Sequence, residues 1–265
     1  MNDRIRHALI VSIPPLVTLL AMIVLWHLAV IVFQMPPYLV PTPKRVGVVL
    51  LQEAGPLARA TWLSGRAALC GFAISLGLGT SVAIVFSQSA LVRRSLYPYA
   101  IFLQTVPIVA IAPLIINWLG PGFWGVVVVS TIISLFPIVA STTAGLTTVP
   151  SGLVDLFRLH RANRIQRLFK LQLPHAVPAL INGARASSGL AVVGSIVGEF
   201  FAGYSVDEPG LGMIITHSSS LLKTDLLFAA MILSALLGVM IFGTVSLLTM
   251  LTLRRWYGGV ADPNA

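Results

Sequence analysis

Charged residues are scarce in this chain. Lys, Arg, Asp and Glu together make up 9% of its 265 residues, whereas a soluble domain carries about 25%. The stretch from Ser95 to Val154 contains no Asp, Glu, Lys, Arg or His at all. The hydrophobic fraction is 57% and the mean hydropathy is +0.93. This composition excludes an ordinary soluble globular protein and predicts an integral membrane protein.

Acidic residues and cysteine are the scarcest reactive groups. Eight Asp+Glu against 17 Lys+Arg give a net charge of +9. In a soluble protein this excess would suggest nucleic acid as a partner. Here we expect no nucleic acid, because basic residues collect on the cytoplasmic side of membrane proteins. The single cysteine, Cys70, excludes an intramolecular disulfide, and no His, Asp, Glu or Cys cluster has the spacing of metal ligands.

Motifs for catalysis are also missing. The chain has no Gly-x-x-x-x-Gly-Lys-Ser/Thr loop, so we expect no ATP hydrolysis by this polypeptide. We find no Ser/His or His/Glu pair in facing spans, which argues against an intramembrane enzyme. The first apolar run, Ala8–Phe33, is too long for the roughly 7–15 residues of a signal-peptide core, and we interpret it as an uncleaved span.

Long uncharged runs are abundant, by contrast. A membrane span needs about 20 predominantly apolar residues, and the runs predict six of them in one all-α, polytopic domain over residues 1–265. The expected spans cover approximately residues 8–33, 67–92, 97–119, 123–146, 179–202 and 226–253.

Prolines and glycines refine this prediction. Pro107 and Pro113 are expected to bend the third span, which is tolerated where neighbours satisfy the freed carbonyls. A turn is expected at Gly120-Pro121-Gly122, and a short amphipathic helix over Val46–Ala60. Glycines in the second and fifth spans are expected to let neighbouring helices approach closely. They are Gly71, Gly77, Gly79, Gly194 and Gly198.

Basic residues predict the orientation. If the N-terminus lies inside, eleven of the 17 Lys+Arg fall in inner segments, and the outer segments hold fewer. The positive-inside rule then predicts a multi-pass protein of the plasma membrane with both termini in the cytoplasm. It also puts the segment 151–178 in the cytoplasm.

The segment 151–178 holds the longest concentration of charge in the chain. Ser151 is predicted to be the N-cap of a first short helix. Asn163 and Gln166 form a capping-box pattern for a second one. Pro174 and Pro178 are predicted to break the chain into a stiff elbow before the fifth span.

Two interpretations of this segment are open. It could be a basic juxtamembrane loop that binds anionic lipid headgroups. It could instead be a lever that docks into a groove on a cytoplasmic protein. The apolar Leu156, Phe157 and Leu159 are hard to explain in a solvated loop, and they favour the lever.

The same residues resemble the EAA loop of ABC importer permeases. The resemblance is carried by Asp155-Leu156-Phe157, then Arg161, then Leu171-Gln172-Leu173-Pro174. Further segments resemble the nitrate/sulfonate/taurine-type permeases and their thiamine- and pyrimidine-precursor relatives. These segments are Leu39-Val40-Pro41-Thr42-Pro43, Gly71-Phe72, Gln104-Thr105-Val106-Pro107, Ala112-Pro113-Leu114, Gly198-Glu199-Phe200 and Gly210-Leu211-Gly212.

Two positions depart from the family pattern. The consensus Glu-Ala-Ala is Asp155-Leu156-Phe157, where Asp can take over the acidic charge. The glycine that forms the turn between the two short helices is Arg161 here. We therefore expect that the turn avoids positive φ at Arg161, or that Ala162-Asn163 absorbs it, because Asn tolerates the left-handed region far better than Arg.

The resemblance implies a fold like that of the type I ABC importer permeases, and an importer of a small solute. That solute would be a nitrate-, sulfonate- or taurine-like anion, or a compound like a thiamine or pyrimidine precursor. The implied partners are a second copy of this chain, two copies of an ATP-binding subunit that holds ATP and Mg²⁺, an extracytoplasmic solute-binding protein and membrane lipid. This chain itself would hold no cofactor. The implied ATPase-coupling residues are Asp155, Leu156, Phe157, Leu159, Arg161, Asn163, Leu173, Pro174 and Pro178.

Polar groups inside spans are candidates for the translocation path. Glu199 is the only carboxylate within an expected span, which makes it a functional candidate; alternatively it reaches headgroups or water. Gln104 and Asn117 could line a cavity or bond neighbouring helices. Arg185, near the start of the fifth span, is expected to extend to the membrane surface.

A self-contained secondary transporter or channel is the alternative function. Such proteins usually carry several intramembrane charges or an internal repeat with interrupted helices. We see one such carboxylate and no convincing repeat, so the importer permease is the favoured hypothesis.

Overall fold

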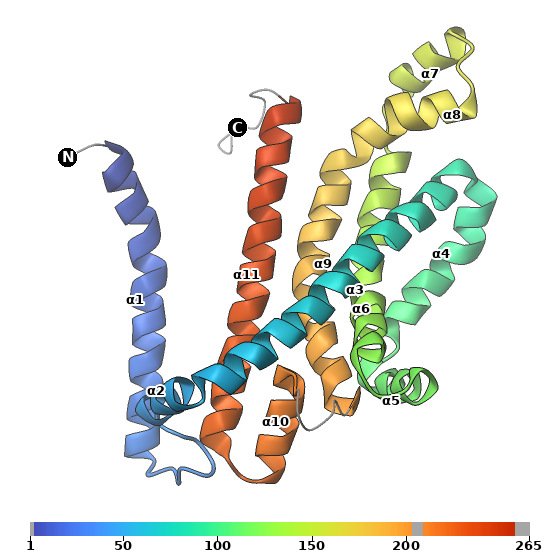
Figure 1. The fold of residues 1–265 in the computed structure, drawn as a ribbon. Coiled ribbons are helices and arrows are strands. Elements are labelled where there is room, and N and C mark those ends of the chain that lie inside the picture. The colour runs from blue at the N-terminus through green and yellow to red at the C-terminus, as the bar shows by residue number, and fades with distance from the viewer. Residues whose placement is uncertain (1–2, 203–208, 258–265) are drawn as a thin grey trace. The chain divides into compact units, whose positions relative to one another are not determined.

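The computed structural model describes residues 3–202 and 209–257, and almost all of this backbone is helical (Figure 1). No strand occurs in the described part of the chain, which confirms the all-α fold class. The elements are α1 (Asp3–Val32), α2 (Pro43–Gln52), α3 (Ala54–Gln88), α4 (Ala90–Thr105), α5 (Ile108–Leu119), α6 (Phe123–Thr147), α7 (Ser151–Leu159), α8 (Arg164–Arg167), the π-helical turn η1 (Leu168–Gln172), α9 (Leu173–Ala202), α10 (Leu211–Ser220) and α11 (Thr224–Tyr257).

Within the described residues, five helices are long and apolar enough to cross a membrane. They cover Ile13–Val32, Ala54–Gln88, Phe123–Thr147, Arg164–Ala202 and Thr224–Thr252. Three of them overlap expected spans closely, whereas Ala54–Gln88 and Arg164–Ala202 begin well before the expected 67–92 and 179–202. The count of six spans stays a prediction.

The expected third span, 97–119, is two helices. α4 ends at Thr105, and Pro107 is the extended N-cap of α5, with ψ 111°. Proline disfavours a helical conformation in the residue before it and supplies no N–H for the helix ladder. Val106 is accordingly extended, and the chain breaks where we expected a bend. Pro113, in contrast, lies inside α5.

The short helix before α3 is also shifted relative to the sequence prediction. α2 covers Pro43–Gln52 rather than Val46–Ala60. Thr42 caps it, because its side chain accepts a hydrogen bond from the backbone N–H of Arg45 at 3.4 Å. Pro43 then occupies the first turn, where no N–H is needed.

The chain divides into two compact units. The first comprises Met1–Ala58 and Ile214–Ile232. Within it, Trp26 of α1 stacks on Phe228 of α11 with ring centroids 5.6 Å apart. The second unit comprises Arg59–Met213 and Leu233–Ala265, and it holds every site residue considered below. The single permease domain that we expected over 1–265 stays a prediction.

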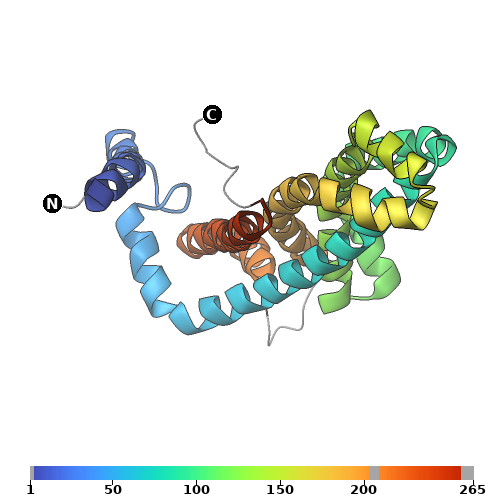
Figure 2. The same cartoon turned by 90° about the horizontal axis from the view of Figure 1, so that it is seen from above.

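The antiparallel pair α6 and α9 is the centre of the second unit (Figures 1 and 2). A Cβ on Gly194 would meet the backbone of Ser130, and one on Gly198 would meet Val126. The Ser130 hydroxyl donates to the Ala191 carbonyl at 2.8 Å across this contact. Small residues let two backbones approach this closely, and the close-packing face predicted at Gly194 and Gly198 is confirmed.

Most of α3 and the C-terminal part of α11 also belong to the second unit. Gly71 and Gly79 of α3 pack on Ser130 and Ile138 of α6, so these helices run in the same direction, whereas no atom lies near Gly77. α11 runs antiparallel to α9. The C-terminal ends of α3, α6 and α11 therefore lie with the N-terminal end of α9, where α7 and α8 extend (Figure 1). We call this the loop end of the unit.

Candidate functional site

The first helix of the segment 151–178, which we call the coupling loop, begins at Ser151. The expected role of Ser151 as N-cap was wrong: Pro150 is the N-cap, with no side-chain hydrogen bond. Ser151 already has helical backbone angles, so its hydroxyl cannot cap the helix from outside. The backbone N–H groups of Leu153 and Val154 donate to the Pro150 carbonyl instead.

The turn between α7 and α8 uses Arg161 as a left-handed residue. Its φ is +49°, so the expectation that Arg161 avoids positive φ was wrong. The N–H of Arg161 donates to the Arg158 carbonyl, and the N–H of Ala162 donates to the Phe157 carbonyl, each at 2.9 Å. These two bonds form a Schellman motif, which usually ends on glycine. Arg161 therefore adopts the conformation that the family glycine would supply.

The second helix of the loop begins with the expected capping box. The Asn163 side chain accepts a hydrogen bond from the Gln166 N–H at 2.7 Å, and the Gln166 side chain accepts one from the Asn163 N–H at 2.9 Å. The two side chains lie three residues apart, so the sequence pattern alone predicts their pairing, and the structure confirms it.

No elbow separates the coupling loop from α9. The helix is continuous from Arg164 to Ala202, and Pro174 and Pro178 lie within it. In place of a break, the π-helical turn Leu168–Gln172 precedes Pro174. A proline ring clashes with the carbonyl four residues earlier in an α-helix, and the wider π turn relieves that clash. The predicted break was wrong, and α8 continues directly into α9.

Apolar side chains are exposed along the coupling loop. Leu156 and Leu159 on α7 are 47% and 81% exposed, and Ile165 on α8 is 67% exposed. With Leu153, also exposed, we call them the docking surface. Asp155 lies beside them, and its one ion pair among the described residues is with Arg158, at 3.1 Å in an exposed i,i+3 bridge.

Other residues predicted for coupling lie deeper. Phe157 is half-buried, and so are Leu173, Pro174 and Pro178 within α9. Leu173 packs against the core cluster of Ala83, Leu146, Leu168 and Ala176. The residues predicted for coupling therefore form two sets, an exposed one on α7 and the following turn and a half-buried one at the start of α9.

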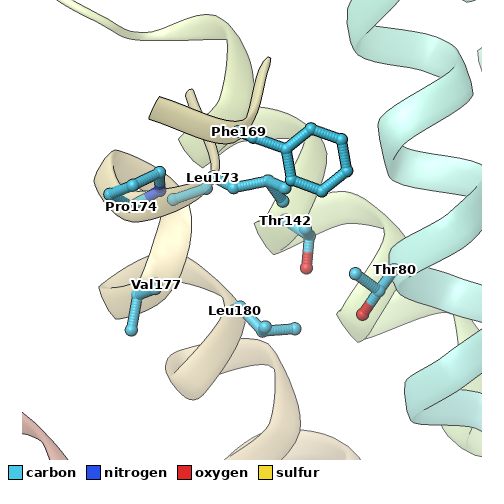
Figure 3. A pocket seen from close by; sticks show the side chains of 8 residues that line it. Thr80, Thr142, Phe169, Leu173, Pro174, Val177 and Leu180 are labelled. Atoms are coloured by element: carbon cyan, nitrogen blue, oxygen red, sulfur yellow. The ribbon is translucent and has the colours of Figure 1, made fainter. Parts of the chain in front are cut away.

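A cavity of about 200 Å³ lies beside the π-helical turn (Figure 3). Its walls come from α3, α6, η1 and the start of α9. Thr80 and Thr142 supply its hydroxyl groups. The remaining lining is apolar, from Phe169, Leu173, Pro174, Ala176, Val177 and Leu180.

The Glu199 carboxylate is buried at the opposite end of α9, with 1% of the residue exposed. Its Oε2 accepts hydrogen bonds from the Ser64 hydroxyl and the Gly212 N–H, each at 2.8 Å. The Ser64 oxygen in turn accepts from the Leu211 N–H at 3.0 Å. Because free N–H groups at a helix start favour an anion, this carboxylate anchors the beginning of α10 to α3 and α9.

The two glycines around Leu211 make this contact possible. A Cβ on Gly210 would fall on the Glu199 carboxylate, and one on Gly212 would meet the Ile196 carbonyl and the Glu199 side chain. Gly210-Leu211-Gly212 and Glu199 both belong to segments that resemble the family, but their contact was not predicted. Ser64 was not predicted either, because it lies 135 residues from Glu199 in the chain and no local pattern indicates it.

The candidates for the translocation path do not meet in one place. Gln104, near the end of α4, and Asn117, on α5, are exposed, whereas Glu199 is enclosed in the contact just described. Their participation in transport stays a prediction.

The helices and the coupling loop define a multi-pass membrane protein of the transport type. Residues 75–263 match the family of binding-protein-dependent transport system inner membrane components, and the chain belongs to that family. It is thus a permease component of ABC importers and not a catalytic enzyme.

Curated relatives agree with this assignment. The chain is 32% identical over 242 residues to the riboflavin transport system permease protein RibX of Chloroflexus aurantiacus, covering 91% of this chain and 88% of RibX. It is 27% identical to the formylaminopyrimidine transport permease protein ThiX of Halalkalibacterium halodurans, covering 88% and 92%. It is 29% identical to the putative aliphatic sulfonates transport permease protein SsuC of Escherichia coli, covering 88% of each chain.

A solved structure shares the fold. A chain of the MetNI methionine ABC transporter in inward-facing conformations superimposes with a TM-score of 0.63. The match covers 75% of this chain and 97% of that chain, at 19% identity. The fold expected from the resemblance to type I importer permeases is confirmed.

Proposed function

We propose that this permease component forms the membrane path of an ATP-driven importer and takes its driving motion through the docking surface. The observation that carries the proposal is the continuous helix from Arg164 to Ala202. A force on α8 reaches α9 without leaving the helix. The Schellman hydrogen bonds order the end of α7, and the capping box orders the start of α8, so both sides of the short turn between them are fixed locally.

A separate ATP-binding subunit, in two copies, is the proposed partner at the docking surface. ATP and Mg²⁺ are bound by that subunit. The four exposed leucine and isoleucine side chains of the docking surface suit an apolar groove on that subunit. A second copy of this chain completes the path, and an extracytoplasmic solute-binding protein delivers the solute.

A cytoplasmic position of the loop end is part of this proposal. Nine basic residues belong to segments at that end: Arg93, Arg94, Arg158, Arg161, Arg164, Arg167, Lys170, Arg254 and Arg255. The opposite end of the second unit has Arg59 and Arg66. This asymmetry supports the orientation with both termini inside.

The proposed substrate is a small solute, either a nitrate-, sulfonate- or taurine-like anion or a heterocycle like a thiamine or pyrimidine precursor. The relatives include permeases for riboflavin, formylaminopyrimidine and aliphatic sulfonates, which supports this range. Calorimetric titration of the cognate solute-binding protein with one member of each class tests it. Binding of none of these classes contradicts it.

The test of coupling is the double substitution Leu156→Ala and Leu159→Ala. The tagged chain is expressed from its own locus and purified with its ATP-binding subunit. Because burying each leucine contributes about 1.5–3 kcal/mol, we expect at least a tenfold loss of co-purified subunit and of solute uptake. Leu51→Ala is the matched control, since Leu51 of α2 is as exposed as Leu159, 81% each.

Two results would contradict the proposal. The first is unchanged subunit binding and uptake in the double variant while the protein still inserts normally. The second is solute transport by the purified chain in liposomes that contain no ATPase, which would instead support a secondary transporter or channel.

A further inference from the structure

Arg185 is an exposed cation on α9, within the expected fifth span 179–202. Two contacts from α11 hold it. Its Nε donates a hydrogen bond to the Ser246 hydroxyl at 3.2 Å, and its guanidinium lies over the Phe242 ring, 5.8 Å from the centroid. The Nε atom and one face of the guanidinium therefore contact α11.

These contacts fix the level of the Arg185 guanidinium along α9. A Cβ on Gly238 of α11 would touch Val192 of α9, and the two helices are antiparallel. Arg185 lies seven residues before Val192 on α9, which places it about 10 Å closer to the loop end than the Gly238–Val192 contact. At that level its neighbours on α11 are the residues around Ser246. Phe242 lies one turn farther from the loop end than Ser246. The guanidinium thus stays at its own level along α9, and the expected extension of Arg185 to the membrane surface stays a prediction.

No acid neutralises this cation within the described part of the second unit. Asp155 is on α7 and pairs with Arg158. Glu199 is buried 14 residues farther along α9, which is about 21 Å of helix. The terminal nitrogens of Arg185 have no hydrogen-bond partner among the described residues. An unpaired charge at membrane depth is costly unless it has a ligand or water.

Two polar side chains near Arg185 can donate hydrogen bonds to a ligand. Asn182 lies three residues earlier on α9, on the same helix face, and is exposed. Ser246 accepts from Arg185, and its own hydroxyl proton has no acceptor among the described residues. A guanidinium fork with an amide and a hydroxyl beside it matches the geometry of an oxyanion, and charge-assisted hydrogen bonds to such a group are the strong ones.

We propose that Arg185, with Asn182 and Ser246, binds an oxyanion between α9 and α11: the carboxylate, sulfonate or phosphate of a solute, or the phosphate of a lipid headgroup. The solute form rests on the proposed transport function and would make Arg185 a specificity residue. The lipid form does not depend on that function.

The test uses the purified full chain without any ATPase, so that it is independent of coupling. In a neutral detergent, the thermal unfolding midpoint is measured against inorganic phosphate and methanesulfonate at constant ionic strength set with chloride. In mixed micelles of phosphatidylcholine and phosphatidylglycerol, native mass spectrometry counts the retained anionic lipid. We expect Arg185→Gln to weaken binding of the preferred probe about ten- to a hundredfold, because a hydrogen bond to a charged group contributes about 1.5–3 kcal/mol.

The matched control is Arg94→Gln, which removes the same charge from an exposed position at the start of α4. We expect it to leave binding unchanged. Ser246→Ala and Arg185→Lys keep a cation in place, and we expect intermediate affinities from both, which covers the case in which the glutamine variant does not fold. A response to the free anions identifies a solute site, and selective retention of phosphatidylglycerol identifies a lipid site. Equal binding by the parent chain and Arg185→Gln, or binding of neither probe by the parent chain, would overturn the proposal.

Discussion

Arg161 carries a backbone conformation that costs an ordinary L-residue about 1–2 kcal/mol relative to glycine. Its φ of +49° closes the Schellman turn that joins α7 to α8. Among the described residues, the Arg161 guanidinium makes no ion pair or hydrogen bond that would offset this cost. The turn is thus held by its neighbours and not by a preference of Arg161 itself.

Replacing Arg161 with glycine is expected to stabilise the turn by about 0.5–1 kcal/mol. Glycine removes the left-handed cost, and its greater freedom in the unfolded chain offsets part of that gain. Hydrogen exchange at the N–H groups of residues 161 and 162 should slow about two- to fivefold after correction for intrinsic rates. Arg161→Ala removes the same charge and keeps the left-handed cost, so it should show no slowing. Equal slowing in both variants would assign the effect to charge.

Residue-level patterns are predictable from the sequence when both partners are local. The capping box of Asn163 and Gln166 is such a case, because three residues separate the two side chains. The partner of Glu199 is not, because Ser64 reaches it only through the packing of α3 on α9. The conformation of Arg161 was mispredicted for a related reason. Residue preference argues against a left-handed Arg, and the hydrogen bonds of the two flanking helices outweigh it.

At the scale of elements, the start of α10 depends on the contact with Glu199. Gly212→Ala adds a methyl group against the Ile196 carbonyl and the Glu199 side chain. We expect a loss of about 1–3 kcal/mol in the free energy of unfolding, as for other overpacked sites. The measurement is thermal or denaturant unfolding in detergent.

Gly243→Ala is the control for that prediction, because no atom lies within reach of a Cβ at Gly243, inside α11. There the change should stabilise the helix by about 0.5–1 kcal/mol, since alanine is the better helix former. Opposite signs for the two glycine variants support the packing role of Gly212. Destabilisation of similar size at both positions would count against it.

Prolines show why element boundaries were only partly predictable. Pro107 ends one helix and begins the next, whereas Pro174 sits in a continuous one. The difference lies in the π turn Leu168–Gln172, which depends on packing of Leu168 and Leu171 in the core. The sequence predicts that a proline disturbs a helix, but the packing around it decides how.

At the scale of the whole molecule, the direction of the chain through the bilayer can be tested without a partner. The contacts among α3, α6, α9 and α11 put the coupling loop and the turn between α5 and α6 at opposite ends of the second unit. If the loop end is cytoplasmic, Leu159 faces the cell interior and Pro121 faces outside. Both positions are exposed, so a cysteine at either should react with a thiol reagent that reaches it.

The experiment starts from Cys70→Ser, which removes the only native thiol. In intact cells, a membrane-impermeant maleimide should label Pro121→Cys and leave Leu159→Cys unlabelled. Permeabilised cells should label both, which shows that the thiol at residue 159 is present and reactive. The reverse pattern in intact cells would show the opposite orientation, in which the docking surface lies outside the compartment that holds ATP. The basic residues of the loop end would then lie outside, against the positive-inside rule. The proposed coupling to a cytoplasmic ATP-binding subunit would fail with them.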